Sequence, residues 1–280
     1  MRLEWSRQYI EGDLWTPSCC GIYLHNSNGI FFFALNHGSV NGFLVCEDGI
    51  DEVYKSTDNR KAKIPGKWLS VEDNHYLMFS EDFCISLDTF EECDTIPPSF
   101  VSAFRNQEKR RLKDLLFLDG YSFTAGDYVI RRSGAFTYHC FFKGERKWAL
   151  KTQGYLYTPI REYKGKLLIG TAGQGGRFYE VSLDNGDVVS EYNTGGTCEI
   201  CYRNGIAYFP VLGRESKLVS VSLEDGIFLG ELSLRGGTSI ESRMYIDHDK
   251  LFISTYEFKT KTAYRDCRPA RGFIECISLD

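Results

Sequence analysis

The chain has 280 residues, of which 42% are hydrophobic and 25% charged, and its formal net charge is −5 at pH 7. This is the composition of an ordinary globular protein, long enough to bury about three quarters of its unfolded surface without disulfide staples. The longest apolar run, Gly29–Gly38, is far shorter than the roughly 20 residues of a membrane-spanning helix, which excludes a membrane span. The N-terminus lacks the apolar stretch of a secretory signal, so we expect a cytoplasmic protein with reduced cysteines.

Short strands recur along the chain at regular intervals. Strand-like segments that run into a turn end at Cys46, Leu87, Phe142, Leu183, Leu223 and Leu279. Apolar runs that follow a turn residue begin at Ile30, Tyr76, Tyr128, Leu167, Ile206 and Leu251. The two sets of markers alternate, and the hairpin Val181–Gly186 is repeated almost letter for letter at Val221–Gly226. The sequence therefore predicts repeated units of about 40 residues.

Units of this length, built from short strands and Asp/Asn/Gly turns, are typical of β-propeller blades. Each unit is expected to hold four strands, and Asp225-Gly226 turns the third strand of the fifth unit into the fourth. The fold class predicted is all-β, a six-bladed propeller of four-stranded blades with one inserted helix. We expect residues 1–280 to form a single domain.

The last unit ends at Cys276–Asp280, after only three strands. The segment Arg2–Ser6 resembles Glu145–Ala149, which is the predicted fourth strand of the third unit. We therefore expect the N-terminal strand to pair with the C-terminal blade, because such pairing closes the ring and leaves no free edge at the seam.

The Ser-Leu-Asp/Glu hairpins at Val181–Gly186 and Val221–Gly226 resemble the repeats of quinoprotein (PQQ-repeat) β-propellers. That resemblance implies a propeller fold in which a tryptophan of the fourth strand recurs. Trp148 and Trp5 occupy its place here, whereas Tyr192 and Leu232 replace it in other units. Cofactor-bearing members are longer, have eight blades and are exported, so we expect a member that binds no cofactor.

Chemistry-bearing motifs are weak. The pair Cys19 and Cys20 falls in the first blade without an acidic cluster, and Cys198 and Cys201 lack the second half of a zinc site. The glycine-rich stretch Gly170–Gly176 lacks the Lys-Ser/Thr of a phosphate loop and is interpreted as a flexible connection. No metal spacing links the histidines, which are His25, His37, His75, His139 and His248. We predict no metal site and no cofactor, and the catalytic residues, if any, are unknown.

Two insertions interrupt the repeat, and both are basic. One is a helix over about residues 100–116, with an apolar stripe and basic residues at helical spacing. The other is a loop over about residues 259–272. In a propeller both connections leave from the same face, so we expect one partner-binding surface. Its predicted residues are Arg105, Lys109, Arg110, Lys113, Lys259, Lys261, Arg265, Arg268 and Arg271.

A basic rim on a chain of net charge −5 steers an anionic partner. The predicted function is therefore non-enzymatic binding of an acidic protein surface, as an inhibitor or immunity-type protein would do. The alternative is a hydrolase or lyase that acts on an anionic small molecule in the central channel. Nucleic acid is a poorer candidate, because a pI of about 5.7 opposes phosphate binding.

Overall fold

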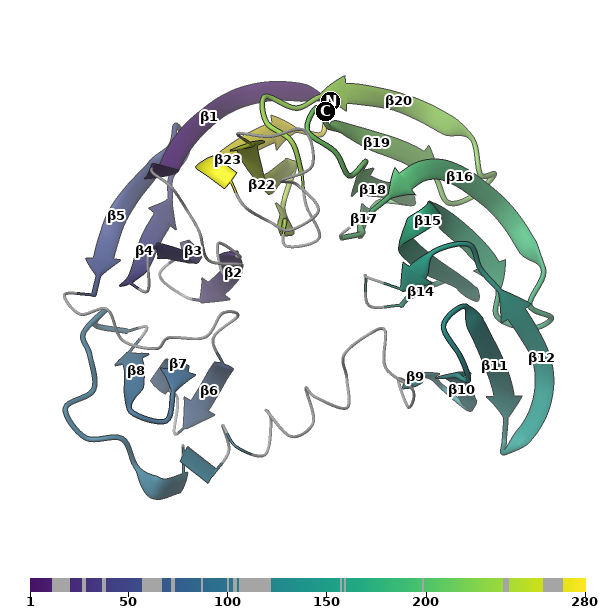
Figure 1. The fold of residues 1–280 in the computed structure, drawn as a ribbon, viewed down its shortest axis with the longest axis horizontal. Coiled ribbons are helices and arrows are strands. Elements are labelled where there is room, and N and C mark those ends of the chain that lie inside the picture. The colour runs from purple at the N-terminus through teal and green to yellow at the C-terminus, as the bar shows by residue number, and fades with distance from the viewer. Residues whose placement is uncertain are drawn as a thin grey trace.

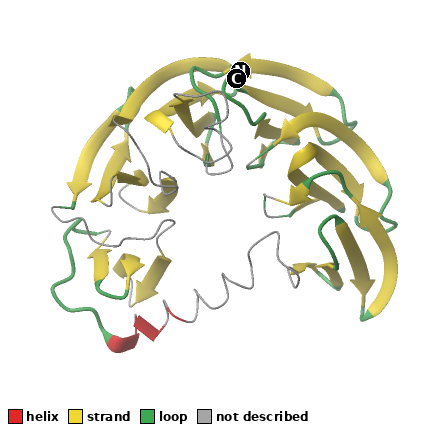
Figure 2. Ribbon diagram, in the orientation of Figure 1, coloured by secondary structure: helices red, strands yellow, loops and turns green. Residues whose placement is uncertain are grey.

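The protein is described by a computed structural model. It describes residues 1–11, 21–26, 29–36, 39–56, 67–71, 74–86, 88–99, 101–102, 105, 122–156, 158, 160–197, 199–238, 242–258 and 269–280. Most of these residues lie in strands, and those in helical conformation are 98–99, 101–102 and 105 (Figure 2). The backbone N–H of Val101 donates to Pro97 O at 3.3 Å, so the predicted helix begins here, and residues 106–116 of that prediction lie outside the described residues. In the described part of the chain, no helix is long and apolar enough to cross a membrane.

The strands in the described part of the chain form six small antiparallel sheets, numbered here in chain order. Sheet 1 holds β2 (Gly21–Asn26), β3 (Gly29–Asn36), β4 (Ser39–Val45) and β5 (Ile50–Lys55). Sheet 2 holds β6 (Lys67–Val71), β7 (Asn74–Ser80) and β8 (Phe83–Ser86). Sheet 3 holds β9 (Ser122–Ala125), β10 (Tyr128–Arg132), β11 (Thr137–Phe142) and β12 (Glu145–Lys151).

The second half of the chain forms the other three sheets. Sheet 4 holds β13 (Tyr155–Leu156), β14 (Arg161–Tyr163), β15 (Lys166–Ser182) and β16 (Val188–Gly196). Sheet 5 holds β17 (Cys201–Arg203), β18 (Ile206–Pro210), β19 (Lys217–Ser222) and β20 (Phe228–Ser233). Sheet 6 holds β21 (Met244–Asp247), β22 (Lys250–Phe258) and β23 (Pro269–Ser278), and β1 (Arg2–Glu11) is its fourth strand.

The sheets follow one another around a common centre, each with its first strands innermost and its last strand outermost (Figure 1). This is the arrangement of a β-propeller, so the predicted all-β, propeller-like fold is confirmed. The predicted strand starts and strand ends also fall within two residues of the observed ones. Turn chemistry is local, which is why the sequence pattern locates these boundaries well.

The first strand completes the last sheet, as predicted. Arg2 lies opposite Ser278, Trp5 opposite Cys276, and the antiparallel pairing continues to Glu11 opposite Arg271. The two chain ends lie side by side in Figure 1. A salt bridge of 3.4 Å between Lys250 Nζ and Glu4 Oε2 adds a contact between β22 and β1 across β23.

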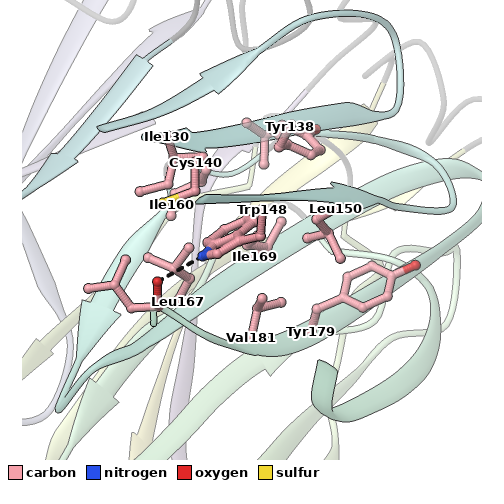
Figure 3. Close-up of a cluster of buried hydrophobic side chains, with 12 residues drawn as sticks. Ile130, Tyr138, Cys140, Trp148, Leu150, Ile160, Leu167, Ile169, Tyr179 and Val181 are labelled. Atoms are coloured by element: carbon pink, nitrogen blue, oxygen red, sulfur yellow. Dashed lines mark hydrogen bonds between the residues drawn. The ribbon is translucent and has the colours of Figure 1, made fainter. Parts of the chain in front are cut away.

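Apolar clusters fill the spaces between neighbouring sheets. Among the described residues, such clusters join sheets 6 and 1, 1 and 2, 3 and 4, 4 and 5, and 5 and 6. Figure 3 shows the cluster between sheets 3 and 4, where Trp148 and Leu150 of β12 point toward Leu167, Ile169 and Val181 of β15. Alternate residues of β12 are buried, as expected for a strand with one face against a neighbour. Between sheets 2 and 3 the chain runs through residues 99–121, most of which lie outside the described residues.

A tryptophan of the outermost strand fastens one sheet to the next. Trp148 Nε1 of sheet 3 donates to Leu183 O at the turn of sheet 4 at 2.9 Å (Figure 3). Trp5 Nε1 of sheet 6 donates to Glu47 O at the corresponding turn of sheet 1 at 2.8 Å. Both indoles are buried, so each contact satisfies a polar group that would otherwise be left unpaired in the core.

Tyrosines make the same connection at two other interfaces. Tyr54 OH of β5 donates to Glu92 Oε1 beside β8 at 2.8 Å, and Tyr192 OH of β16 donates to Gly226 O at the turn of sheet 5. Leu232 of β20 instead packs into the cluster between sheets 5 and 6.

The strand register corrects one prediction. In β12 a β-bulge leaves Lys147 unpaired, and Trp148 follows it directly. Directly after the equivalent bulges of β16 and β20 come Ser190 and Gly230. The prediction that Tyr192 and Leu232 occupy the tryptophan position was therefore wrong by two residues, because the sequence alone does not reveal a bulge.

The glycine-rich stretch Gly170–Gly176 is also different from the prediction. The chain reverses at Gly173 and Gly175, whose φ angles are 70° and 82°, so the predicted connection is present, but its residues belong to β15. A Cβ on Gly176 would lie 2.5 Å from Thr171 O. Glycine is required here because two backbone segments pack against each other.

The repeated turn glycine has a specific packing role. Gly186 has a φ of 78°, and a Cβ placed on it would lie 2.6 Å from Cδ2 of Trp148. Glycine thus lets the turn of sheet 4 lie against the indole of sheet 3 while adopting a left-handed conformation.

Gly186→Ala is therefore predicted to destabilise the protein for two reasons, the strained left-handed φ and a clash with the indole of Trp148. Gly126→Ala is the matched control, since Gly126 has a φ of 57° with nothing within 4 Å. The control is expected to cost about 1–2 kcal/mol, and Gly186→Ala about 1–3 kcal/mol more. Denaturant unfolding of both variants measures the difference, and equal losses would refute the packing role.

Candidate functional site

The structure describes two of the nine predicted partner-binding residues. Arg105 and Arg271 are described. Lys109, Arg110, Lys113, Lys259, Lys261, Arg265 and Arg268 lie outside the described residues.

Arg105 stands at the beginning of the predicted basic helix and contacts sheet 2. Its Nε and Nη2 donate to the two carboxylate oxygens of Glu81 at 2.8 and 2.5 Å. Glu81 lies in the turn between β7 and β8 and lines a hollow with Asp82, Glu92, Cys93, Asp94 and Ile96. Arg105 is therefore held beside an acidic surface of its own chain.

Arg271 stands at the end of the basic loop. It lies opposite Glu257 on β22 and Glu11 on β1, and its guanidinium is 3.5 Å from the Glu257 carboxylate. Phe258 and Pro269, which flank the loop, pair across β22 and β23, with a register shift between Glu257 and Phe258. Residues 259–268 lie outside the described residues.

Both kinds of connection lie on one side of the sheets, which we call the insertion face. Arg105, between sheets 2 and 3, meets the β7–β8 turn at Glu81. Thr238, between sheets 5 and 6, forms a β-bridge with Gly213 in the β18–β19 connection. In each contact, a connection between two sheets meets a connection between the second and third strands of one sheet. The basic helix belongs to the first kind of connection and the basic loop to the second, so both are expected on the same side.

The two ion pairs hold the arginines loosely. The Arg105 and Glu81 side chains are 59% and 48% exposed, and those of Arg271 and Glu257 are 48% and 44% exposed. Exposed pairs of this kind contribute about 0–1 kcal/mol. A carboxylate of a partner could therefore replace either glutamate at little cost.

Other arginines beside these connections are largely engaged within the chain. Arg132 donates to Gly134 O and Ala135 O, and Arg177 pairs with Glu191 at 3.0 Å. The guanidinium of Arg235 lies over the Phe273 ring, 4.8 Å from its centroid.

A second charged cluster lies at the inner strands of sheets 4, 5 and 6. Arg161 Nη2 of β14 is 3.6 Å from Glu199 Oε1, and Arg243, which precedes β21, also acts on this carboxylate. The Glu199 side chain is only 13% exposed, whereas that of Arg161 is 46% exposed. Two cations thus face one shielded carboxylate.

Burial dominates the electrostatics of this cluster. It raises the pKa of Glu199 above the ordinary value of 4.5, and the guanidinium groups of Arg243 and Arg161 offset the rise only in part. The same burial raises the pKa of the neighbouring Cys201 thiol. Carboxyl groups with raised pKa values occur often at functional sites, although structural clusters show them too.

The cluster was not predicted from the sequence. Glu199 and Arg243 hold equivalent places before the first strands of consecutive sheets, so an alignment of the repeats could have paired them. Arg161 lies two residues further along its own unit and needs the three-dimensional structure to be included.

The remaining sequence candidates supply no second site in the described part of the chain. Cys19, Cys20 and Cys198 lie outside it, and the described cysteines are free thiols. Burial raises their pKa values, to about 11 at Cys140, to about 12 at Cys276 and further at Cys84 and Cys201, so they are poor nucleophiles at neutral pH. Among the described residues, no group of three His, Cys, Asp or Glu side chains could hold a metal ion.

No protein-family model and no curated protein matches the chain. Among solved structures, Sqt1 of Saccharomyces cerevisiae is 9% identical with a TM-score of 0.42, and the match covers 89% of this chain and 68% of Sqt1. BamB of Moraxella catarrhalis is 14% identical with a TM-score of 0.39, over 91% and 74% of the two chains. The computationally designed Ika8 protein is 8% identical with a TM-score of 0.45, over 91% and 88%. Similarity at this level transfers no function to this chain.

Replacing Glu199 by Gln should raise the melting temperature at pH 7. Because the pKa of Glu199 is raised in the folded state, its protonated form stabilises the fold. This contribution to the free energy of unfolding is fully present below pH 4.5 and is lost as the pH rises through the folded-state pKa. Gln mimics the protonated form, so the gain should be present at pH 7 and absent at pH 4. Thermal unfolding at both pH values measures it, with exposed Glu145→Gln as control, and a Glu199→Gln variant less stable at pH 7 would contradict this account.

Proposed function

We propose that the chain is a single-domain, six-bladed β-propeller that binds an acidic protein surface through its insertion face and catalyses no reaction. In this proposal the six sheets close into a ring, with residues 99–121 joining sheets 2 and 3. The protein works in the cytoplasm, as an inhibitor or immunity-type protein that occludes its target.

The position of Arg105 and Arg271 is the observation that carries the proposal. Each stands at the root of one basic insertion and is held by an exposed carboxylate that a partner could displace. Beyond these roots the sequence carries further basic residues, so a partner with grouped carboxylates gains several charge-assisted contacts at once.

Charge reversal tests the proposal. Proteins captured from an extract of the native cell are quantified for the natural chain, for the variant R105E/R265E/R271E and for the control K143E/R146E/K164E. The control residues stand at or beside turns on the opposite side of the sheets and give the same change in net charge. Like charges placed against a partner's carboxylates cost several kcal/mol, so the first variant should lose its acidic partners by more than about tenfold.

The control variant should retain these partners, and raising the salt concentration should release them from the natural chain. Recovery of the same proteins by the natural chain and by R105E/R265E/R271E would overturn the proposal.

The second candidate is an enzyme that acts on an anionic small molecule at the centre of the ring. The observation that favours it is the cluster of Arg161, Glu199 and Arg243. Glu199→Gln separates the candidates, because it leaves the insertion face intact but removes the carboxylate of this cluster, which an enzyme would use for proton transfer.

A further inference from the structure

Five large apolar side chains are exposed at the start of two outermost strands. They are Val188 (43% exposed), Val189 (51%), Ile227 (56%), Phe228 (50%) and Leu229 (52%). We call them the outer apolar patch. They belong to β16 and β20 of the neighbouring sheets 4 and 5, with Ile227 in the turn before β20 (Figure 1).

The two halves of the patch lie on segments that pack against each other. A Cβ placed on Gly226, next to Ile227, would lie 3.2 Å from the Cβ of Ser190, next to Val189. The hydroxyl of Tyr192 on β16 also donates to Gly226 O. The beginning of β16 therefore lies directly against the turn that leads into β20.

The fold does not require apolar residues at these positions. The β-bulge marks equivalent places in each outer strand, and the bulged residues of β16 and β20 are Val189 and Leu229. In sheets 3 and 6 the bulged residues are Lys147 and Glu4. The residues before the bulge show the same contrast, since Glu145-Arg146 in sheet 3 stands where Ile227-Phe228 stands in sheet 5.

Carboxylates lie in the turns at one end of the patch. Asp184 and Asp187 lie in the turn before β16, and Glu224 and Asp225 in the turn before β20. Asp184 and Glu224 have exposed lysine partners, Lys147 at 3.3 Å and Lys164 at 3.6 Å. Asp187 and Asp225 instead accept hydrogen bonds within their own turns, from Asn185 and from the N–H of Ile227. The patch is therefore apolar at its centre, with an acidic border at one end.

The bulges at Val189 and Leu229 interrupt the ladder at the outer edge, which disfavours the addition of another strand. A partner must therefore contact the patch through side chains. A helix with one apolar stripe between Lys and Arg residues matches both the apolar centre and the acidic border.

We propose that the outer apolar patch is a second docking surface, which binds a basic amphipathic helix of a partner protein. It lies on the outer strands and not on the insertion face, so it is independent of the proposed binding of an acidic partner. The chain would then hold two partners of opposite charge.

The test uses an 18-residue helical peptide of Leu and Lys with one apolar stripe, and a scrambled peptide of equal composition. Their affinities are measured by fluorescence anisotropy for the natural chain and for the variant V188T/V189T/I227T/F228T/L229T. Threonine preserves strand propensity and charge, so the variant should fold, and circular dichroism checks this. The variant should bind the striped peptide at least about tenfold more weakly, because the substitutions remove much of the apolar surface that the peptide's stripe would bury.

Leu3→Thr is the matched control, since Leu3 is 36% exposed at the equivalent place in sheet 6, outside the patch. It should leave the affinity unchanged, whereas D187N/D225N should weaken binding at low salt. No binding by the natural chain, equal binding of both peptides, or equal binding by the threonine variant would overturn the proposal. Self-association of the natural chain that the threonine variant abolishes in sedimentation would overturn it too, because the occupant would then be a second copy of the chain.

Discussion

The antiparallel pairing of β1 with β23 is the interaction on which the rest of the structure depends. It joins residues from the two ends of the chain in one sheet, and it places Trp5 and Tyr9 in the cluster between sheets 6 and 1. Trp5 then reaches Glu47 O, so a strand that completes one sheet also fastens the next. The same strand closes an edge that would otherwise offer unpaired backbone groups to other chains.

At several interfaces a side chain of the outermost strand forms a hydrogen bond to the following sheet, but the donor group differs. Indoles of Trp5 and Trp148 and hydroxyls of Tyr54 and Tyr192 each reach a turn or edge of the following sheet. Each contact needs a close approach, and at Gly186 only a residue without a side chain permits it. This coupling explains why a turn and an aromatic residue of the preceding unit recur together in the repeat.

Local rules predicted the order of strands and the pairing of the chain ends, because turn residues and apolar alternation act over a few residues. They could not locate the bulges, so Tyr192 and Leu232 were assigned a position that Ser190 and Gly230 hold. The flexibility predicted for Gly170–Gly176 was wrong for a related reason. Its glycines are needed for close backbone contacts, and these form only in the folded sheet. The charge cluster around Glu199 combines residues of three sheets, so it forms only when these sheets are assembled. No pattern within a few residues of sequence could have predicted it.

The structure separates three kinds of surface. The insertion face carries the roots of two basic segments, the inner strands carry a shielded carboxylate between arginines, and the outer strands of sheets 4 and 5 carry the outer apolar patch. These surfaces lie on different parts of each sheet, so they can act independently. Their positions all follow from sheets arranged around one centre, with the seam closed by β1.

Cross-linking of the chain ends tests this closure most directly. Arg2 and Ser278 lie opposite each other, so the variant R2C/S278C should form an intramolecular disulfide between residues 2 and 278 under mild oxidation. Peptide mapping by mass spectrometry identifies the bond, and the melting temperature should rise because the linked chain ends restrict the unfolded state. In the control R2C/K151C the second cysteine lies at the end of β12 in sheet 3, and residue 2 should not bond to it. Failure of residues 2 and 278 to cross-link, or equal cross-linking in the control, would contradict the account.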